Sequence, residues 1–524
     1  MKLINKRIIF MLLALSFMLS CQDSFLDRPS QSGTSTDNFY QTKEDLRLAT
    51  AALYGGKPWW QYNQSYLELG DILSGDLIAQ WWAEAVQLNT FTVSGSNGIL
   101  SSAWTGLYNT VGHSNATINA ILEKTPASVS DVDKNAALGE AKFIRAVSYY
   151  HLAMLWQDVP IIEDNRKLVT SPLVNRNTVE DVYKFIVSDL TFASEHLPTS
   201  DTPGRVTTWS AQGMLAKVYL TMAGLGHADG SRDQALLDKA KLYAQNVCTK
   251  SGLTLLPNYD NLFKTQYNDN VESLFALQWT ATSGWGIGNQ LLTHSPSDAL
   301  NPGKTGAWTP YPPTYDLFEL YVEKDSVRRK ATFMLPGDHY AELNRAEGGY
   351  TASGSSMKKH IIGNELDNNT PSMTFLGSIE HNYILRLADV YLIYAEAILG
   401  NSASTADADA LFYFNKVRTR AGVDVVTSLN TDVILKERRI ELACEGQFWY
   451  DLVRLSYYNP TKAISMLSNQ KRVLFDYDKV TKVATPKDPF AAISPATEST
   501  FKLGLPSSEI IANPKLAQPP VPYY

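Results

Sequence analysis

Cysteine is scarce in this chain, with three among 524 residues. Cys21 directly follows an N-terminal apolar run, and the rest of the chain contains Cys248 and Cys444. Disulfide-stabilised scaffolds carry many closely spaced cysteines, so this class of protein is excluded. We expect Cys248 and Cys444 to be buried free thiols.

Charged residues are also sparse, at 19% of the chain, below the roughly 25% that is usual in globular proteins. The net charge is -7, so the sequence offers no basic surface of the kind that binds nucleic acid. Aromatic residues are plentiful instead, with 27 Tyr and 11 Trp. The composition therefore excludes a nucleic-acid partner and directs attention to the aromatic rings.

Catalytic and metal-binding motifs are missing as well. None of the eight histidines begins a His-Glu-x-x-His zinc motif, and no cysteine pair has the spacing of metal ligands. Gly303-Lys304-Thr305 resembles the end of a phosphate-binding loop, but Asp298 stands where that loop needs its first glycine. We expect no catalytic residues, no metal and no cofactor.

A long apolar run is missing even at the N-terminus. Residues 8–19 are uncharged and apolar, about twelve residues where a membrane-spanning helix needs roughly twenty. Lys2, Lys6 and Arg7 precede this run, and the pattern predicts a signal peptide over residues 1–20. Ser20 followed by Cys21 at the end of this segment predicts that the Cys21 thiol is lipidated. Acyl chains on Cys21 would then hold the protein at a membrane.

Helical periodicity dominates much of the chain after residue 44. Apolar residues recur at three- and four-residue spacing, the pattern of helices that bury one face. This spacing predicts helices over residues 45–54, 102–123, 136–156, 179–196, 209–223, 234–249, 383–399, 406–421 and 433–455. Alanine and tyrosine three residues apart recur inside them, as at Ala146/Tyr149 and Ala216/Tyr219, at about two tetratricopeptide periods from each other. We therefore expect stacked helical hairpins.

The character of the chain changes between residues 253 and 380, where Gly, Pro, Asn and aromatics replace the helical pattern. Residues 273–279 alternate like a short strand. A loop-rich segment of this length is usually functional or disordered. The predicted division is a signal peptide at 1–20, a lipidated tether at 21–37, a helical-repeat region at 38–252, an irregular lobe at 253–380, a second helical-repeat region at 381–470 and a loop-rich C-terminal segment at 471–524.

Four segments resemble the SusD/RagB family of outer-membrane nutrient-binding lipoproteins. They are residues 20–27 (SCQDSFLD), 139–160 (GEAKFIRA to QDVP), 386–397 (RLADVYLIYAEA) and 437–454 (ERRIEL to Gly446, Asp451 and Arg454). The resemblance implies a mostly helical fold, with about four tetratricopeptide-like hairpins and an irregular lobe that contains short strands and the ligand site. It also implies surface localisation at the outer membrane and a partner, a SusC-like TonB-dependent outer-membrane transporter to which a glycan nutrient is delivered.

Two aromatic segments have the composition of a glycan site. Sugar rings stack on aromatic faces, and their hydroxyls need polar partners because an unpaired, desolvated hydroxyl costs about 1 to 3 kcal/mol. The predicted ligand contacts are Asp71, Asp76, Trp81 and Trp82 in the first segment and Trp285, Trp308 and Tyr311 in the second. By their positions Trp81 or Trp82 and Trp285 or Trp308 resemble the family's ligand-binding aromatics.

Two other functions remain open from the sequence. A glycoside hydrolase would need two carboxyl groups about 5 to 9.5 Å apart across a cleft. A helical-repeat adhesin would instead hold another protein on its surface. The charged segment with Glu437, Arg438, Arg439, Glu441 and Glu445 is interpreted as a structural network in which Arg438 pairs with Glu441 or Glu445, and we expect binding without chemical turnover.

Overall fold

The computed structural model describes residues 39–281, 287–369, 373 and 377–524. The predicted signal peptide, the lipidation site at Cys21 and the tether lie outside the described residues, as does Trp285. None of the described helices combines the length and apolar character that crossing a membrane requires. Both remaining cysteines are free, Cys444 buried and Cys248 half-buried.

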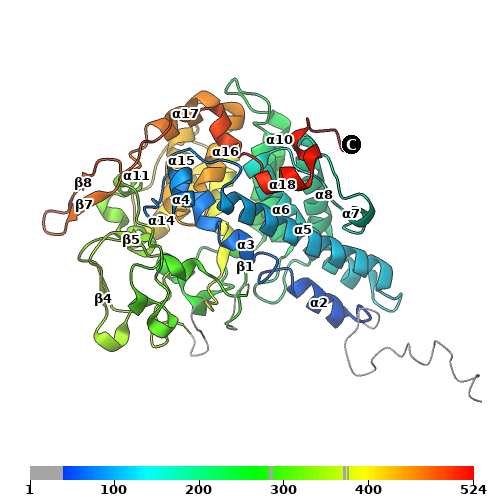
Figure 1. Ribbon diagram of the computed structural model, residues 1–524, viewed down its shortest axis with the longest axis horizontal. Coiled ribbons are helices and arrows are strands. Elements are labelled where there is room, and N and C mark those ends of the chain that lie inside the picture. The colour runs from blue at the N-terminus through cyan, green and yellow to red at the C-terminus, as the bar shows by residue number, and fades with distance from the viewer. Residues whose placement is uncertain (1–38, 282–286, 370–372, 374–376) are drawn as a thin grey trace, which may run out of the picture.

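Pairs of consecutive helices pack against each other along the chain, which confirms the predicted helical-repeat scaffold (Figure 1). The pairs are α5 (Gly98–Lys124) with α6 (Asp131–Trp156), α8 (Val179–His196) with α9 (Thr208–Met222), α13 (Leu387–Leu399) with α14 (Ala408–Ala421) and α16 (Phe448–Tyr458) with α17 (Pro460–Ser468). Helix α10 (Gln234–Lys250) contacts both α9 and α13, so it joins the helices of the two halves of the chain.

Polar caps fix where these helices begin. The Ser130 side chain accepts a hydrogen bond from the Asp133 N–H at the start of α6, and Asp407 accepts from Asp409 and Ala410 at the start of α14. Such a cap satisfies an N–H group that has no partner inside the helix. Helix α14 ends at Gly422, which has a φ of 75°, a conformation that costs glycine little.

The irregular lobe between α10 and α13 is built from short strands and short helices, seen in green at the lower left of Figure 1. Strand β1 (Ser273–Leu277) pairs antiparallel with β6 (Asn382–Arg386), β2 (Phe333–Met334) with β5 (Ser356–Met357) and β3 (His339–Tyr340) with β4 (Tyr350–Thr351). The lobe's helices are η3 (Tyr259–Phe263), η4 (Thr265–Tyr267), η5 (Leu291–His294), η6 (Asp298–Leu300), η7 (Pro302–Lys304), α11 (Tyr315–Leu320), η8 (Glu323–Asp325), α12 (Ser326–Thr332) and η9 (Arg345–Glu347).

The remaining elements lie at the two ends of the chain and between the helix pairs. They are α2 (Lys43–Ala51), α3 (Trp60–Asn63), the π-helix η2 (Glu68–Ile72), α4 (Ala83–Asn89), α7 (Lys167–Thr170), α15 (Thr431–Glu441), the hairpin of β7 (Phe475–Asp478) and β8 (Val483–Pro486), η10 (Glu498–Phe501), α18 (Ser507–Ala512) and η11 (Pro514–Ala517). Helix α18 lies near the C-terminus, red in Figure 1.

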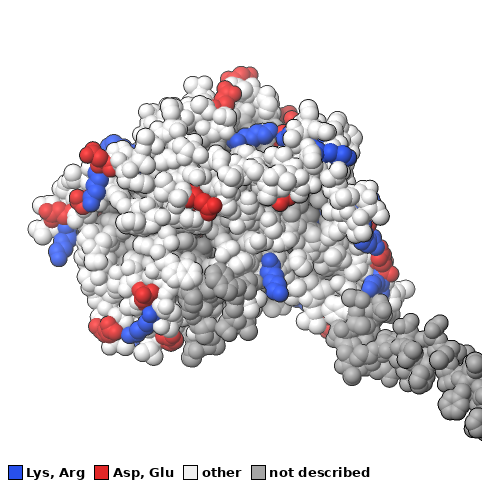
Figure 2. Space-filling view, viewed as in Figure 1, with Lys and Arg blue, Asp and Glu red and all other residues white. Residues whose placement is uncertain are grey.

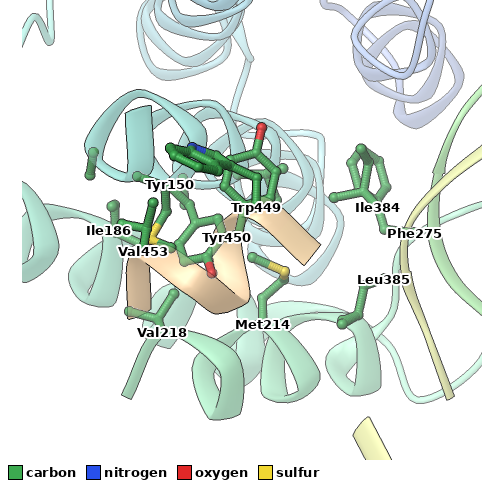
Figure 3. Packing of buried hydrophobic residues seen from close by; sticks show 14 of the residues in the cluster. Tyr150, Ile186, Met214, Val218, Phe275, Ile384, Leu385, Trp449, Tyr450 and Val453 are labelled. Carbon is green, nitrogen blue, oxygen red and sulfur yellow. The ribbon is translucent and has the colours of Figure 1, made fainter. Parts of the chain in front are cut away.

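A single large apolar core extends through both helical regions and reaches β1 and β6. Trp449 and Tyr450 of α16 share it with Tyr150 of α6, Met214 of α9 and Phe275 of β1 (Figure 3). Smaller clusters lie under the irregular lobe. The lobe is therefore anchored to the scaffold through the β1–β6 pair.

The single helix predicted over residues 433–455 is wrong. The structure has two helices there, α15 and α16, separated by a turn in which Cys444 has a φ of 61° and Gly446 a φ of 65°. A left-handed residue ends an α-helix, and the periodicity of the flanking residues does not reveal it. The helix predicted from residue 383 likewise begins at Leu387, because residues 382–386 form β6 against β1.

Candidate functional site

Two aromatic segments that are far apart in the sequence adjoin in the fold. Leu77 and Pro313 form an antiparallel bridge, and the Ile78 N–H donates to the Pro312 carbonyl at 3.0 Å. Beyond this bridge the chain continues to Trp81 in one segment and comes from Trp308 in the other. The two segments therefore adjoin at a bridge that lies four residues before Trp81 and five residues after Trp308.

Both tryptophans are turned towards solvent. Trp81 is 78% exposed and Trp308 is 55% exposed, whereas Trp59, Trp156 and Trp449 are fully buried in the core. Exposed rings on two adjoining segments are unusual, because a buried indole contributes strongly to the hydrophobic free energy of folding. We call Trp81 and Trp308 the exposed tryptophan pair.

Trp82 is half-buried beside this pair. Its ring packs against the main core, and its Nε1 donates to Glu84 Oε2 at 3.1 Å. Glu84 Oε1 also accepts from the Gly98 N–H at 2.9 Å, at the start of α5. The Trp82 side chain is thus fixed between α4 and α5, and its place among the ligand contacts stays a prediction.

Asp71 and Asp76 do not face a ligand, and that prediction is wrong. Both carboxylates are completely buried. Asp71 accepts from the Cys444 N–H at 2.7 Å and from the Gly446 N–H at 2.9 Å. Asp76 accepts from Arg439 Nε at 2.6 Å. These carboxylates therefore stabilise the fold, Asp71 by satisfying the two amides in the turn between α15 and α16.

Tyr311 is also buried, which corrects its predicted contact with a ligand. Its hydroxyl donates to Glu68 Oε1 at 2.7 Å, and its ring stacks on the His294 ring with the centroids 4.1 Å apart. His294 in turn donates from Nδ1 to the Thr309 carbonyl at 2.8 Å, next to Trp308. Tyr311 therefore lies behind the exposed pair and supports it.

Glu68 and His294 carry no signal in the sequence that marks them as part of this region. Glu68 belongs to the π-helix η2 and His294 to η5 in the irregular lobe. No spacing or motif connects two residues so far apart in the chain. Glu68 and His294 become buried next to each other only because η2 packs against the irregular lobe in the folded chain.

The charged segment at residues 437–445 is a structural network, as predicted, although the predicted partners of Arg438 are wrong. Arg438 pairs with Asp389 at 2.7 Å and with Asp451 at 2.8 Å. Glu441 and Glu445 instead pair with Arg386, each at 2.7 Å. All these groups are buried, so the network joins helices and offers nothing to a ligand.

The exposed pair offers two indole faces to solvent. Within the described ranges no three His, Cys, Asp or Glu side chains come together in a way that could hold a metal ion. On the face shown in Figure 2, charged side chains are scattered over the surface and much of its centre is uncharged.

Comparisons with known proteins identify the relatives of this chain. The model of the SusD family matches residues 266–524, and a second family model, described as starch-binding associating with outer membrane, matches residues 24–220. A SusD-like protein of Bacteroides ovatus is 38% identical over 96% of this chain and 96% of its own length. SusD-like protein P2 of Formosa agariphila is 27% identical, covering 86% of this chain and 91% of its own.

Solved structures show the same fold. A crystal structure with xylogluco-oligosaccharide is 37% identical, has a TM-score of 0.85 and covers 91% of this chain and 99% of its own. A laminarin-binding SusD-like protein is 24% identical with a TM-score of 0.65, covering 83% of this chain and 96% of its own. Identity across nearly the whole length of the Bacteroides ovatus relative, together with these shared folds, shows that the chain belongs to the SusD family.

Proposed function

We propose that the protein binds a glycan nutrient at the outer membrane and delivers it unchanged to a TonB-dependent transporter, with Trp81 and Trp308 as the principal ligand contacts. The exposed tryptophan pair carries this proposal, because two solvent-facing indoles lie on adjoining segments, whereas Trp59, Trp156 and Trp449 are buried in the core. Trp82 and Trp285 complete the proposed site.

The physical basis is stacking. The weakly positive C–H groups of a sugar ring pair with the negative face of an indole, and the contact also removes apolar surface from water. A related protein 37% identical to this chain has been crystallised with xylogluco-oligosaccharide, which supports a β-glucan of this kind as the ligand class. The low charge of the surface suits a neutral polysaccharide.

Localisation is proposed on two grounds. The N-terminal pattern predicts a signal peptide and lipidation at Cys21. The family model over residues 24–220 is described as associating with the outer membrane. A lipid anchor at Cys21 and exposure at the cell surface would place the tryptophans where a polysaccharide can reach them. Transfer to a SusC-like transporter remains the predicted next step.

Replacing each exposed tryptophan tests the site. Titration calorimetry with xyloglucan oligosaccharides is expected to show that Trp81→Ala and Trp308→Ala each lose about 1 to 3 kcal/mol of binding free energy. Phe412→Ala on α14 is the matched control, because Phe412 is as exposed as Trp308, at 55%, and lies elsewhere in the fold. Unchanged affinity in both tryptophan variants would show that the pair is not the ligand site.

Absence of turnover is tested with the same oligosaccharides. Incubation with the protein is expected to generate no new reducing ends. Sustained release of reducing ends would instead favour the glycoside hydrolase, and binding of a surface protein without any glycan binding would favour the adhesin.

A further inference from the structure

A buried trio of side chains supports the segment that carries Trp308. Tyr311 donates from its hydroxyl to Glu68 Oε1 at 2.7 Å, and the Tyr311 ring stacks on His294 at an interplanar angle of 18°. His294 Nε2 lies 3.6 Å from the same Glu68 oxygen. All three side chains are buried, and Glu68 and Tyr311 are completely so.

The trio is connected to Trp308 by the backbone. The N–H groups of Trp308 and Thr309 both donate to the Thr293 carbonyl, at 3.0 and 3.2 Å. The neighbouring residue, His294, donates from Nδ1 to the Thr309 carbonyl at 2.8 Å. Thr293 and His294 of η5 therefore hold the backbone at Trp308 and Thr309.

The arrangement of the trio favours a shared proton between Glu68 and His294. A carbonyl can only accept, so His294 Nδ1 carries a hydrogen, and the Nε2 of a neutral imidazole is then an acceptor. Nε2 faces Glu68 Oε1, which is also an acceptor when ionised. Glu68 Oε2 is buried and has no hydrogen-bond partner among the described residues. A buried carboxyl oxygen 3.6 Å from an imidazole lone pair is stabilised when the carboxyl group carries a proton.

Burial determines which group holds that proton. It raises the pKa of Glu68 to about 7, although the hydrogen bond from Tyr311 opposes the shift. It lowers the pKa of His294 to about 4, and nearby His360 adds to this effect. The carboxyl group of Glu68 is therefore protonated below neutral pH, and ionising it leaves a negative charge beside the imidazole lone pair.

Other ionisable groups on the surrounding elements have their own partners. Asp71 on η2 accepts from the backbone between α15 and α16, and Glu84 on α4 accepts from Gly98. His360 lies 3.0 Å from Glu380. Lys359 lies 3.0 Å from Glu445 and donates to the Ala443 carbonyl. The neighbouring Lys359 is therefore already paired and does not neutralise the charge of an ionised Glu68.

We propose that Glu68 is a positioning residue for the ligand surface, which in its protonated form holds His294 and Tyr311, and through them Trp308, in the binding arrangement. The inference rests on the proposed function for its effect on ligand affinity. Because burial raises the pKa of Glu68 from about 4.5 to about 7, the stabilisation is fully present below about pH 4.5 and is lost as the pH rises through about 7. Glycan affinity falls over the same range.

The first test needs no ligand. The protein is labelled with 5-fluorotryptophan, and the fluorine resonance of Trp308 is assigned as the one missing from Trp308→Phe. We expect this resonance to shift with pH with a midpoint near 7 in the wild-type protein. In Glu68→Gln the shift is expected to disappear, because a glutamine amide does not titrate in this pH range. A wild-type resonance that does not titrate between about pH 5.5 and about pH 8.5 would overturn the inference.

The second test measures binding of xyloglucan oligosaccharide at about pH 6 and about pH 8.5. Wild-type affinity is expected to fall about threefold to tenfold at the higher pH, the effect of losing roughly one hydrogen bond. Glu68→Gln should change less than about twofold, and the exposed control Glu319→Gln should behave like the wild type. If wild-type affinity is the same at both pH values, Glu68 does not position the surface.

The two tests separate the inference from the proposed function. No binding by any variant, with the fluorine titration present, would refute the glycan site and leave the trio's proton established. Binding without titration would refute the role of Glu68 and leave the glycan site intact. Glu68→Leu, which cannot make either hydrogen bond, is expected to bind more weakly than Glu68→Gln at both pH values.

Discussion

Individual side chains in the first aromatic segment have opposite environments within a few residues of each other. Trp81 faces solvent, whereas Asp71 and Asp76 are completely buried. Burial raises the pKa of Asp71, nearby Asp76 raises it further, and the amides of Gly446 and Cys444 lower it. Asp71 is retained inside because it satisfies backbone donors that would otherwise lack partners.

Removing this carboxylate is expected to destabilise the fold and leave the ligand site unchanged. Asp71→Ala leaves the N–H groups of Cys444 and Gly446 buried without acceptors, at about 1 to 3 kcal/mol for each group. Urea unfolding measures the loss, and Asp71→Asn, which keeps one acceptor oxygen, should lose less. A folded Asp71→Ala protein with normal stability and reduced glycan affinity would contradict the structural role.

At the scale of elements, the turn between α15 and α16 depends on close contact between two glycines. A Cβ added to Gly70 in η2 would overlap the Cα of Gly446, and Gly446 itself has a φ of 65°. The π-helix can therefore approach the turn closely enough for Asp71 to reach its amides. The irregular geometry of both elements follows from this one contact.

We expect Gly70→Ala to destabilise the protein by about 1 to 3 kcal/mol or more, because the backbones must separate. Gly354→Ala is the control, since nothing lies within 4 Å of its added Cβ and its φ is not in the left-handed region. Thermal or urea unfolding of the two variants compares them directly. Equal stability of Gly70→Ala and the wild type would show that the turn can move without cost.

At the scale of the whole molecule, buried arginine–carboxylate pairs connect the irregular lobe with the helices. Arg386, at the end of β6, contacts Glu272 from the lobe at 2.8 Å as well as Glu441 and Glu445. Glu396 on α13 pairs with Arg232 at 3.0 Å and with Arg454 on α16. Removing one partner of such a pair leaves an uncompensated buried charge.

These pairs predict loss of stability in acid. Burial alone raises the pKa of Glu396, but Arg454 and Arg232 outweigh it and hold the pKa at about 2. Glu441 likewise has a pKa of about 2, because Arg420, Arg386 and Arg328 overcome the effect of burial. A depressed pKa contributes stability that is present above the unfolded value, about 4.5, and is lost as the pH falls towards 2.

The free energy of unfolding in urea is therefore expected to fall by on the order of 1 kcal/mol for each pH unit and each such group below about pH 4.5. Glu396→Gln should be less stable at neutral pH by about 3 to 5 kcal/mol and should show a shallower decline in acid. A wild-type protein equally stable at about pH 3 and about pH 6 would contradict this account.

The sequence by itself determined the positions of most helices and membership of the family, because apolar periodicity and short motifs depend on residues near each other in the chain. Helix α8 has the predicted bounds, and α10 differs by one residue at its end. Trp81 and Trp308 were chosen from composition and position, and both are exposed in the folded chain.

Only the tertiary structure decided which polar and aromatic side chains of the site are buried. Asp71 meets Gly446 across 375 residues of sequence, and Tyr311 meets Glu68 across 243. Burial and hydrogen bonding depend on such distant contacts, so local composition could not distinguish a ligand contact from a structural one. The break between α15 and α16 and the Glu68–His294 pair were hidden for the same reason: each exists only where two distant segments pack together.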